Sequence, residues 1–281
     1  MTQVPQMRFP WVPRTRAFGL LLLAVAVSLF AISHLLLGMA GFRYEVPGGS
    51  IVEKIHPATW LAILALAVAV LRSGHPLLWL DHVVRRHKGL LFFAFANAVL
   101  LWHLIMNQKM PFTGLVDTFF LPMTLVLLLE GISERQRATL ERAIHALMAA
   151  NALLGIYEVA TGWHFTPLII GELVQTDDWR ATALMGHPLN NAAVTAHYLL
   201  AIALGGAHAV SRPVRVALFV LNLAALNAFG GRVAFVLAML LLSGIAAWRF
   251  LGVLRGARFA PSTAAFISLA LPVGLAVVAL L

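Results

Sequence analysis

Apolar residues along this chain gather into long runs, and basic residues, glycine and proline separate the runs. A membrane-crossing helix needs about 20 mostly apolar residues to span about 30 Å of hydrocarbon. The pattern therefore predicts an all-α polytopic membrane fold with about nine transmembrane helices. The expected spans have the approximate bounds 17–41, 57–71, 89–106, 113–132, 140–161, 188–210, 213–229, 233–250 and 262–281.

The composition excludes other classes of protein. The 281 residues are 61% hydrophobic and 11% charged, and the mean hydropathy is +0.89. A water-soluble domain carries more charge, and a disordered chain is poor in apolar residues. Because the chain has no cysteine, disulfides, thiolate catalysis and cysteine-ligated zinc are excluded as well.

The basic residues give the chain an orientation. The formal net charge is +9, and cytoplasmic loops of membrane proteins are enriched in lysine and arginine. Alternating loops then place most of the cations inside, with the N-terminus cytoplasmic and residues 1–281 forming a single transmembrane domain. The charge thus serves topology, and we expect no nucleic-acid partner. The cations expected outside are Arg43, Lys54, Lys109, Arg180 and Arg232.

The end of the chain also carries an expectation. The sequence stops at Leu281 inside an apolar run, whereas a membrane span normally has polar residues that anchor it at the interface. We expect a C-terminally truncated chain, with further site residues beyond it.

The longest expected external loop, residues 162–187, combines an apolar, aromatic half with a charged one. Its first half suits a segment that lies in the membrane interface. Its second half holds the charged sequence before Gly186-His187-Pro188, where a helix is expected to begin. The exposed N–H groups of such a helix start attract anions. Candidate residues here are Asp178, Trp179, Arg180, His187, Asn190 and Asn191.

A second expected helix start follows a Gly230-Gly231-Arg232 turn. Arginines at two helix starts, with room made by glycines, suit a phosphate or diphosphate, because a guanidinium binds phosphate oxygens in pairs. Each arginine alone is equally compatible with snorkelling to lipid headgroups. His187 is a candidate general base or phosphate donor, and equally a plain helix cap.

Three acids fall within expected spans, where charge is costly and marks functional sites by default. Asp117 and Glu158 are expected near the outer side, either lining a cavity beneath the arginines or each holding an arginine. Glu130 is expected to reach Arg135 or water. His197 is expected to be a hydrogen-bonded interior residue. No HExxH or similar metal-ligand spacing occurs, so we expect no metal and no cofactor.

The run from Asp178 to Asn191, DWRATALMGHPLNN, followed by the Gly-Gly-Arg turn, resembles the O-antigen ligase and Wzy-type polymerase superfamily. Within it the likeness is to VpsF-like exopolysaccharide biosynthesis proteins, and it is strongest over residues 178–240. The resemblance implies a membrane glycosyltransferase that uses a polyprenyl (undecaprenyl) diphosphate-linked glycan, without metal, on the outer face of the bacterial inner membrane. It implies that Arg180 and Arg232 hold the diphosphate. The family's key histidine usually lies in a later external loop, and His187 matches a different position of the motif.

These features favour a polysaccharide polymerase that joins lipid-linked oligosaccharide units. The expected partners are the polyprenyl-diphosphate glycan, the lipid bilayer and other polysaccharide assembly proteins. Three alternatives stay open. One is a ligase that transfers the glycan to an acceptor. Another is a transporter or flippase for an anionic lipid-linked substrate, which is expected to show internal repeats. The third is a structural membrane subunit whose outer loop docks a partner.

Overall fold

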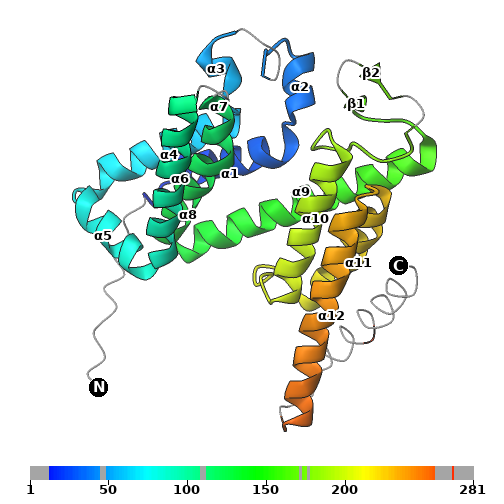
Figure 1. Cartoon of the computed structure of the whole chain (residues 1–281). Coiled ribbons are helices and arrows are strands. Elements are labelled where there is room, and N and C mark those ends of the chain that lie inside the picture. The colour runs from blue at the N-terminus through cyan, green and yellow to red at the C-terminus, as the bar shows by residue number, and fades with distance from the viewer. Residues whose placement is uncertain are drawn as a thin grey trace. The chain divides into compact units, whose positions relative to one another are not determined.

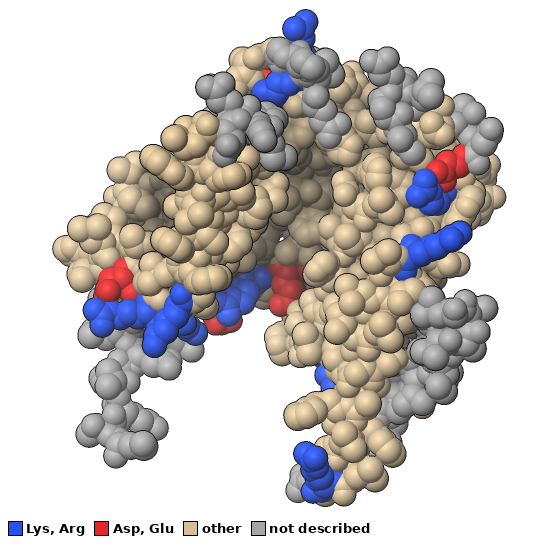
Figure 2. Space-filling model, in the orientation of Figure 1, with Lys and Arg blue, Asp and Glu red and all other residues tan. Residues whose placement is uncertain are grey.

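The computed structural model describes residues 13–44, 49–107, 112–170, 173–175 and 178–256, together with Ser268 (Figure 1). Over these residues the fold is all-α apart from one pair of two-residue strands. By its internal contacts the chain divides into two compact units, residues 1–143 and 144–281. Figure 2 shows that charged side chains on the visible face are confined to small patches, as the composition predicts.

In its described residues the first unit holds eight α-helices, one π-helical segment and the start of a long helix. Its elements are α1 (Arg16–Ala31), α2 (His34–Met39), α3 (Ile51–Lys54), α4 (Pro57–Ser73), α5 (Pro76–Arg86), α6 (Lys88–Asn107), α7 (Phe112–Leu115), the π-helix η1 (Val116–Phe120), α8 (Leu121–Gly131) and the first part of α9 (Glu134–Thr161).

A stripe of alanines forms the core of this unit. Ala58, Ala62, Ala65 and Ala69 repeat at helical spacing along α4 and are buried. Small side chains let helix backbones approach closely, which is how helices pack where lipid removes the hydrophobic driving force. Two neighbouring helices complete this core. Helix α1 contributes Phe18, Leu22 and Val25, and the chain from α8 onwards contributes Leu121, Leu128 and Ile132.

The second unit holds most of α9, the strands β1 (Ile169–Ile170) and β2 (Leu173–Val174), and the helices α10 (Pro188–Ala203), α11 (Arg212–Ala228) and α12 (Arg232–Leu254). The two strands are antiparallel. Helix α10 packs against both α11 and α12, and the three lie side by side in Figure 1. In the chain, α11 follows α10 and runs antiparallel to it. Helix α12 therefore begins at the same end of the unit as α10.

Most helices follow the expected spans, but α9 begins at Glu134, six residues before its expected start, and α10 ends at Ala203, seven residues before its expected end. Two larger differences lie in the first unit. The expected span 17–41 is broken, because Ile32 is extended and the Ser33 side chain caps α2 by accepting from the Leu36 N–H at 3.2 Å. Residues 76–86, expected in a loop, form α5. Within the described residues, α6, α9 and α12 are each long and apolar enough to cross a membrane, and the bent pair α4 and α5 makes up to four. The span at 262–281 and Lys109 lie outside the described residues.

Two acids of this unit that the sequence places within expected spans are paired differently from the expectation. Asp117, in η1, accepts hydrogen bonds from the Tyr44 hydroxyl at 2.7 Å, the Thr59 hydroxyl at 2.6 Å and the His56 N–H at 2.9 Å. Each carboxylate oxygen is thus satisfied without an arginine among these contacts. The π-helical turn brings this carboxylate to the segment before α4.

The sequence predicts Arg135 or water as the partner of Glu130, and the structure shows two other partners. Glu130 lies 2.6 Å from Arg86 Nη1 and 2.9 Å from His87 Nε2. The reason is α5: the helix that the hydropathy pattern missed ends at Arg86 and carries these two side chains to Glu130.

Close packing in the second unit gives a first test. A Cβ atom at Gly155 of α9 would lie 2.5 Å from Cε1 of Phe229, whose side chain is fully buried. Gly155→Ala should lower the unfolding temperature, because overpacking a fixed ring costs about 1–3 kcal/mol, more than the helix propensity that alanine adds. Thermal unfolding in detergent measures this.

The matched control is Gly244→Ala in α12, where a Cβ would meet nothing within 4 Å. That variant should keep or raise the unfolding temperature. Equal shifts in both variants would show that Phe229 is not packed on α9 as described.

Candidate functional site

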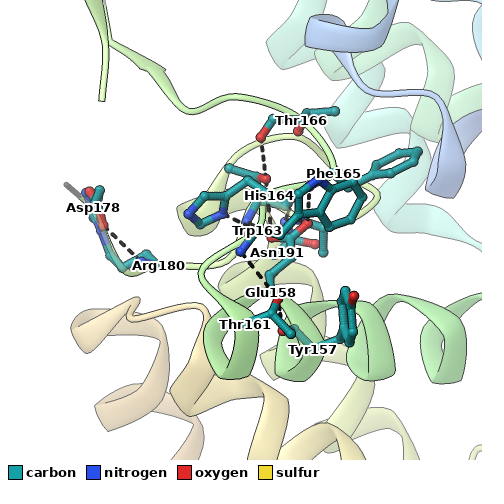
Figure 3. A network of polar contacts seen from close by, with 12 residues as sticks. Tyr157, Glu158, Thr161, Trp163, His164, Phe165, Thr166, Asp178, Arg180 and Asn191 are labelled. Carbon is teal, nitrogen blue, oxygen red and sulfur yellow. Dashed lines mark hydrogen bonds and ion pairs between the residues drawn. The ribbon is translucent and has the colours of Figure 1, made fainter. Parts of the chain in front are cut away.

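A buried carboxylate anchors the loop that was expected to hold the site. Glu158 of α9 is 0% exposed. Its oxygens accept from the N–H groups of Phe165 at 2.9 Å, Thr182 at 2.7 Å and Ala183 at 3.0 Å, and His164 Nδ1 lies 3.4 Å away (Figure 3). A buried charge is stable only when hydrogen-bonded donors surround it. Glu158 therefore holds the loop near both of its ends, and its recorded partners are these groups rather than the expected arginine.

The first half of the loop carries an aromatic cluster. Trp163 packs edge-on against Tyr157 and against Phe165, with ring centroids 6.1 and 6.4 Å apart (Figure 3). All three side chains are exposed. This placement suits the interfacial segment that the sequence predicts for residues 162–187.

The backbone beside Arg180 is fixed from two sides. The Ala181 N–H donates to the Ala228 carbonyl at 3.1 Å, and the two next residues are held by Glu158. The Arg180 stem then passes directly over Gly230, where a Cβ would lie 2.6 Å from Arg180 Cγ. Gly230 also has a φ of +62°, which favours glycine. The glycine is therefore required both by the turn and by the arginine.

The Arg180 guanidinium faces Asp178. Nε donates to Oδ1 at 2.8 Å and to Oδ2 at 3.0 Å, and Nη2 donates to Oδ2. The hydrogen bonds from Arg180 hold the pKa of the Asp178 carboxyl below its ordinary value, and Asp178 raises the pKa of Arg180. Both groups are therefore charged at neutral pH. Asp178 orients the guanidinium and offsets its charge, leaving Nη1 for another partner.

Arg232 differs in being uncompensated. It is the first residue of α12, its side chain is exposed, and it makes no ion pair with the part of the chain that the structure describes. The preceding Gly231 lets the turn lie against α10, because a Cβ there would be 2.3 Å from the Ala192 Cβ. The Gly-Gly turn thus brings the start of α12 to the start of α10.

The two arginines share one pocket of about 1020 Å³, which lies along α10 and α12. At the end where both helices begin, the lining is polar and comprises Gln175, Asp178, Trp179, Arg180, Gly230, Gly231 and Arg232. The rest of the lining is apolar except for His197 and runs from the second residue of each helix: it comprises Leu189, Ala193, Ala196 and Leu200 of α10 and Val233, Ala234, Leu237, Ala238 and Leu241 of α12. The residues from Leu189 to Leu200 extend about 16 Å along α10, at 1.5 Å per residue. We call this space the α10–α12 groove.

One histidine of the groove was not predicted as a site residue. His197 lines the groove and its side chain is exposed, which corrects the expectation of an interior residue. Its Nδ1 lies 2.7 Å from the Ala193 carbonyl, so Nδ1 carries the proton and Nε2 is an acceptor. The helical spacing from Leu189 through Ala193 to His197 was the available signal, but only the position of α12 shows which face of α10 lines a pocket.

The remaining predicted residues lie away from the groove lining. His187 caps α10, its Nδ1 accepting from the Leu189 N–H at 3.2 Å, so that Nε2 carries the proton of the neutral ring. Asn190 is exposed. Asn191 is fully buried and donates to the carbonyls of Thr182 and His187, which ties the loop to α10. Contact of these residues with a ligand stays a prediction.

The arrangement can bind an elongated molecule with an anionic end. The described residues include no group of three or more His, Asp or Glu side chains placed to hold a metal ion. Asp177, in the charged part of the loop, lies outside the described residues. No family model, no curated protein and no solved structure matches this chain. The functional argument therefore rests on the chemistry of the groove.

The Asp178–Arg180 pair predicts a pH dependence. Because the pKa of Asp178 is lowered in the folded protein, the stability that the pair contributes is present above the ordinary carboxyl pKa and is lost as the pH falls through the lowered value. Asp178→Asn should therefore be less stable than the wild type at neutral pH, and the difference should vanish in strong acid. Unfolding of both proteins as a function of pH measures this. A difference that grows towards acid would contradict the ion pair.

The contact of Arg180 with Gly230 gives a second test. Gly230→Ala should displace the arginine and abolish most of the thermal stabilisation by inorganic pyrophosphate, used as an anion probe. Gly205→Ala is the matched control, because Gly205 also has a positive φ, of +99°, but open space around it. Both variants carry the strain of a left-handed alanine, of about 1 kcal/mol. Equal loss of the pyrophosphate effect in both would refute the packing of Arg180 on Gly230.

Proposed function

We propose that this chain is a membrane glycosyltransferase that joins polyprenyl-diphosphate-linked oligosaccharide units, a polysaccharide polymerase. The observation that carries the proposal is the α10–α12 groove, which has two arginines at one end and aliphatic side chains along its length. An isoprenoid diphosphate has the same division, with a long apolar tail and a compact anionic head.

The apolar part of the groove suits the isoprenoid tail. Leu189, Val233, Leu237 and Leu241 line it and remain exposed. In a bilayer these side chains face lipid, so a prenyl tail reaches the groove without leaving the hydrocarbon. Moving the prenyl tail from lipid into the apolar groove changes its free energy little. The selectivity for this ligand therefore comes from the polar end of the groove.

The polar end suits the diphosphate. Arg232 supplies a guanidinium that has no ion pair among the described residues, at the N-terminus of α12, where backbone N–H groups also favour an anion. Arg180 contributes directed hydrogen bonds more than net charge, because Asp178 offsets it. We therefore propose that Arg232 carries most of the charge-dependent affinity. His187, which caps α10 outside the groove lining, acts in this proposal by fixing the start of α10.

These groups fit glycosyl transfer from a diphosphate. The acceptor hydroxyl attacks the anomeric carbon and loses its proton to water. The bond from that carbon to the phosphate oxygen breaks, and the polyprenyl diphosphate leaves with the electron pair. Charge that develops on the leaving group is stabilised by fixed guanidinium and N–H groups, which perform this role without a metal ion. Trp179, exposed at the polar end, offers a flat surface for the first sugar.

The proposal includes the topology that the sequence predicts: about nine spans in the bacterial inner membrane, a cytoplasmic N-terminus, and the loop 162–187 outside. It also includes other polysaccharide assembly proteins as partners. Three or four spans have support from helix length and composition in the described residues.

The decisive experiment uses the purified full-length protein with a polyprenyl-diphosphate oligosaccharide and a chelator, and resolves the glycan products. Wild type should yield a ladder. Arg232→Lys should lose about 100-fold in rate, because lysine cannot make the paired contacts of a guanidinium. Arg212→Lys is the matched control, since Arg212 also opens a helix, is exposed and lies outside the groove lining.

Other outcomes decide against the polymerase. A single transfer to an added acceptor would identify a ligase that uses the same groove. Absence of any product from folded protein that still binds the lipid would favour the transporter. Equal loss in the Arg232 and Arg212 variants would show that the groove is not the site.

A further inference from the structure

Helix α5 leaves α4 at a steep angle. The axes of α4 and α5 differ by 115°, with the break at Gly74, whose φ is +70°. If α4 follows the membrane normal, α5 therefore runs close to the plane of the membrane surface. A continuous span would need both helices nearly in line.

Apart from Leu78, which is 60% exposed and lies among the polar residues, the side chains of α5 divide into an apolar and a polar arc. Trp79 and Val83 are buried against the first unit. The apolar arc continues past them through Leu80 and Leu77, which are 44% and 79% exposed. A helix with 3.6 residues per turn places Leu77 and Leu80 on one side, next to the buried pair. Half of the apolar arc is thus covered by protein, and the other half is not.

Cations lie on the polar arc of α5 and just beyond both of its ends. Arg85 pairs with Asp81 of the same helix, and Arg86 with Glu130. Arg72 at the end of α4 and Lys88 at the start of α6 are exposed, and neither makes an ion pair with a residue that the structure describes. Figure 2 shows basic side chains over the part of the first unit where α5 lies. Cations therefore flank the exposed leucines at both ends of the helix.

We propose that α5 lies in the membrane interface and binds the headgroups of anionic phospholipids. Leu77 and Leu80 enter the acyl region, while Arg72, Arg85 and Lys88 lie at the level of the phosphates. A helix with one apolar side, cations on the other, and an axis in the membrane plane is the arrangement that anionic leaflets bind. This inference does not depend on the proposed glycosyl transfer.

The absence of cysteine makes the test direct, because each single-cysteine variant carries one spin label. Leu77→Cys, Leu80→Cys and His82→Cys are labelled in the full chain in lipid vesicles, with Phe95→Cys of α6 as the deep reference. Labels at 77 and 80 should collide more with oxygen than with a water-soluble nickel chelate, by several-fold, and should both be shallower than the label at 95. The label at 82, on the polar arc, should show the reverse preference.

Two outcomes would overturn the interfacial placement. A label at 82 that is as protected from nickel as the label at 77 would indicate a helix inserted into the hydrocarbon. Labels at 77 and 80 that are as open to nickel as the label at 82 would indicate a helix in water.

The lipid partner is tested with vesicles of phosphatidylcholine, with and without phosphatidylglycerol. Phosphatidylglycerol should move the label at 77 deeper. The double variant Arg72→Gln and Lys88→Gln should lose this response, and Arg212→Gln, on α11, should keep it. An unchanged depth in phosphatidylglycerol, or a response that survives the double variant, would refute recognition of anionic headgroups.

Discussion

The second unit depends on one buried carboxylate. Glu158 is fully enclosed, and a charge in such surroundings must collect donors or remain neutral. It collects backbone N–H groups from two places, Phe165 and the pair Thr182 and Ala183, and thereby draws the loop back onto the end of α9. Arg180 lies two residues before Thr182. The position of the arginine is therefore a consequence of the Glu158 contacts.

The same unit shows how two helix starts become one site. The turn before α12 is made of glycines because Arg180 occupies the space over Gly230 and Ala192 the space beside Gly231. Side chains at either position would separate the loop from the turn. Once α10 and α12 begin at the same end, their facing aliphatic residues form a groove that continues from the arginines. The packing of α10 against α12 therefore produces both the arginine end and the aliphatic walls of the groove. This packing requires glycine at positions 230 and 231.

The sequence predicts more of the elements than of their contacts. Apolar periodicity places α6, α11 and α12 to within a few residues, because long apolar runs are strong local signals. It misses α5, because this amphipathic helix has only 11 residues, too few to cross a membrane. It also misses the break at Ser33, where the side chain caps α2 within a continuous apolar run. The Gly-Gly-Arg turn and the Trp-Arg pair do meet, as expected. The partners of Asp117, Glu130 and Glu158 could not be predicted, because they come from distant segments whose approach is a tertiary property.

The central claim is that the α10–α12 groove holds the tail of a polyprenyl diphosphate. A photoreactive phenylalanine analogue placed at Leu241, on the groove wall, or at the neighbouring Leu240, also exposed but outside the groove lining, tests it directly. With bound polyprenyl diphosphate, mass spectrometry should find the cross-linked lipid at 241 and little at 240, and Arg232→Gln should reduce the product at 241. Equal cross-linking at both positions, unaffected by Arg232, would show that the lipid contacts the helix only as bulk bilayer does.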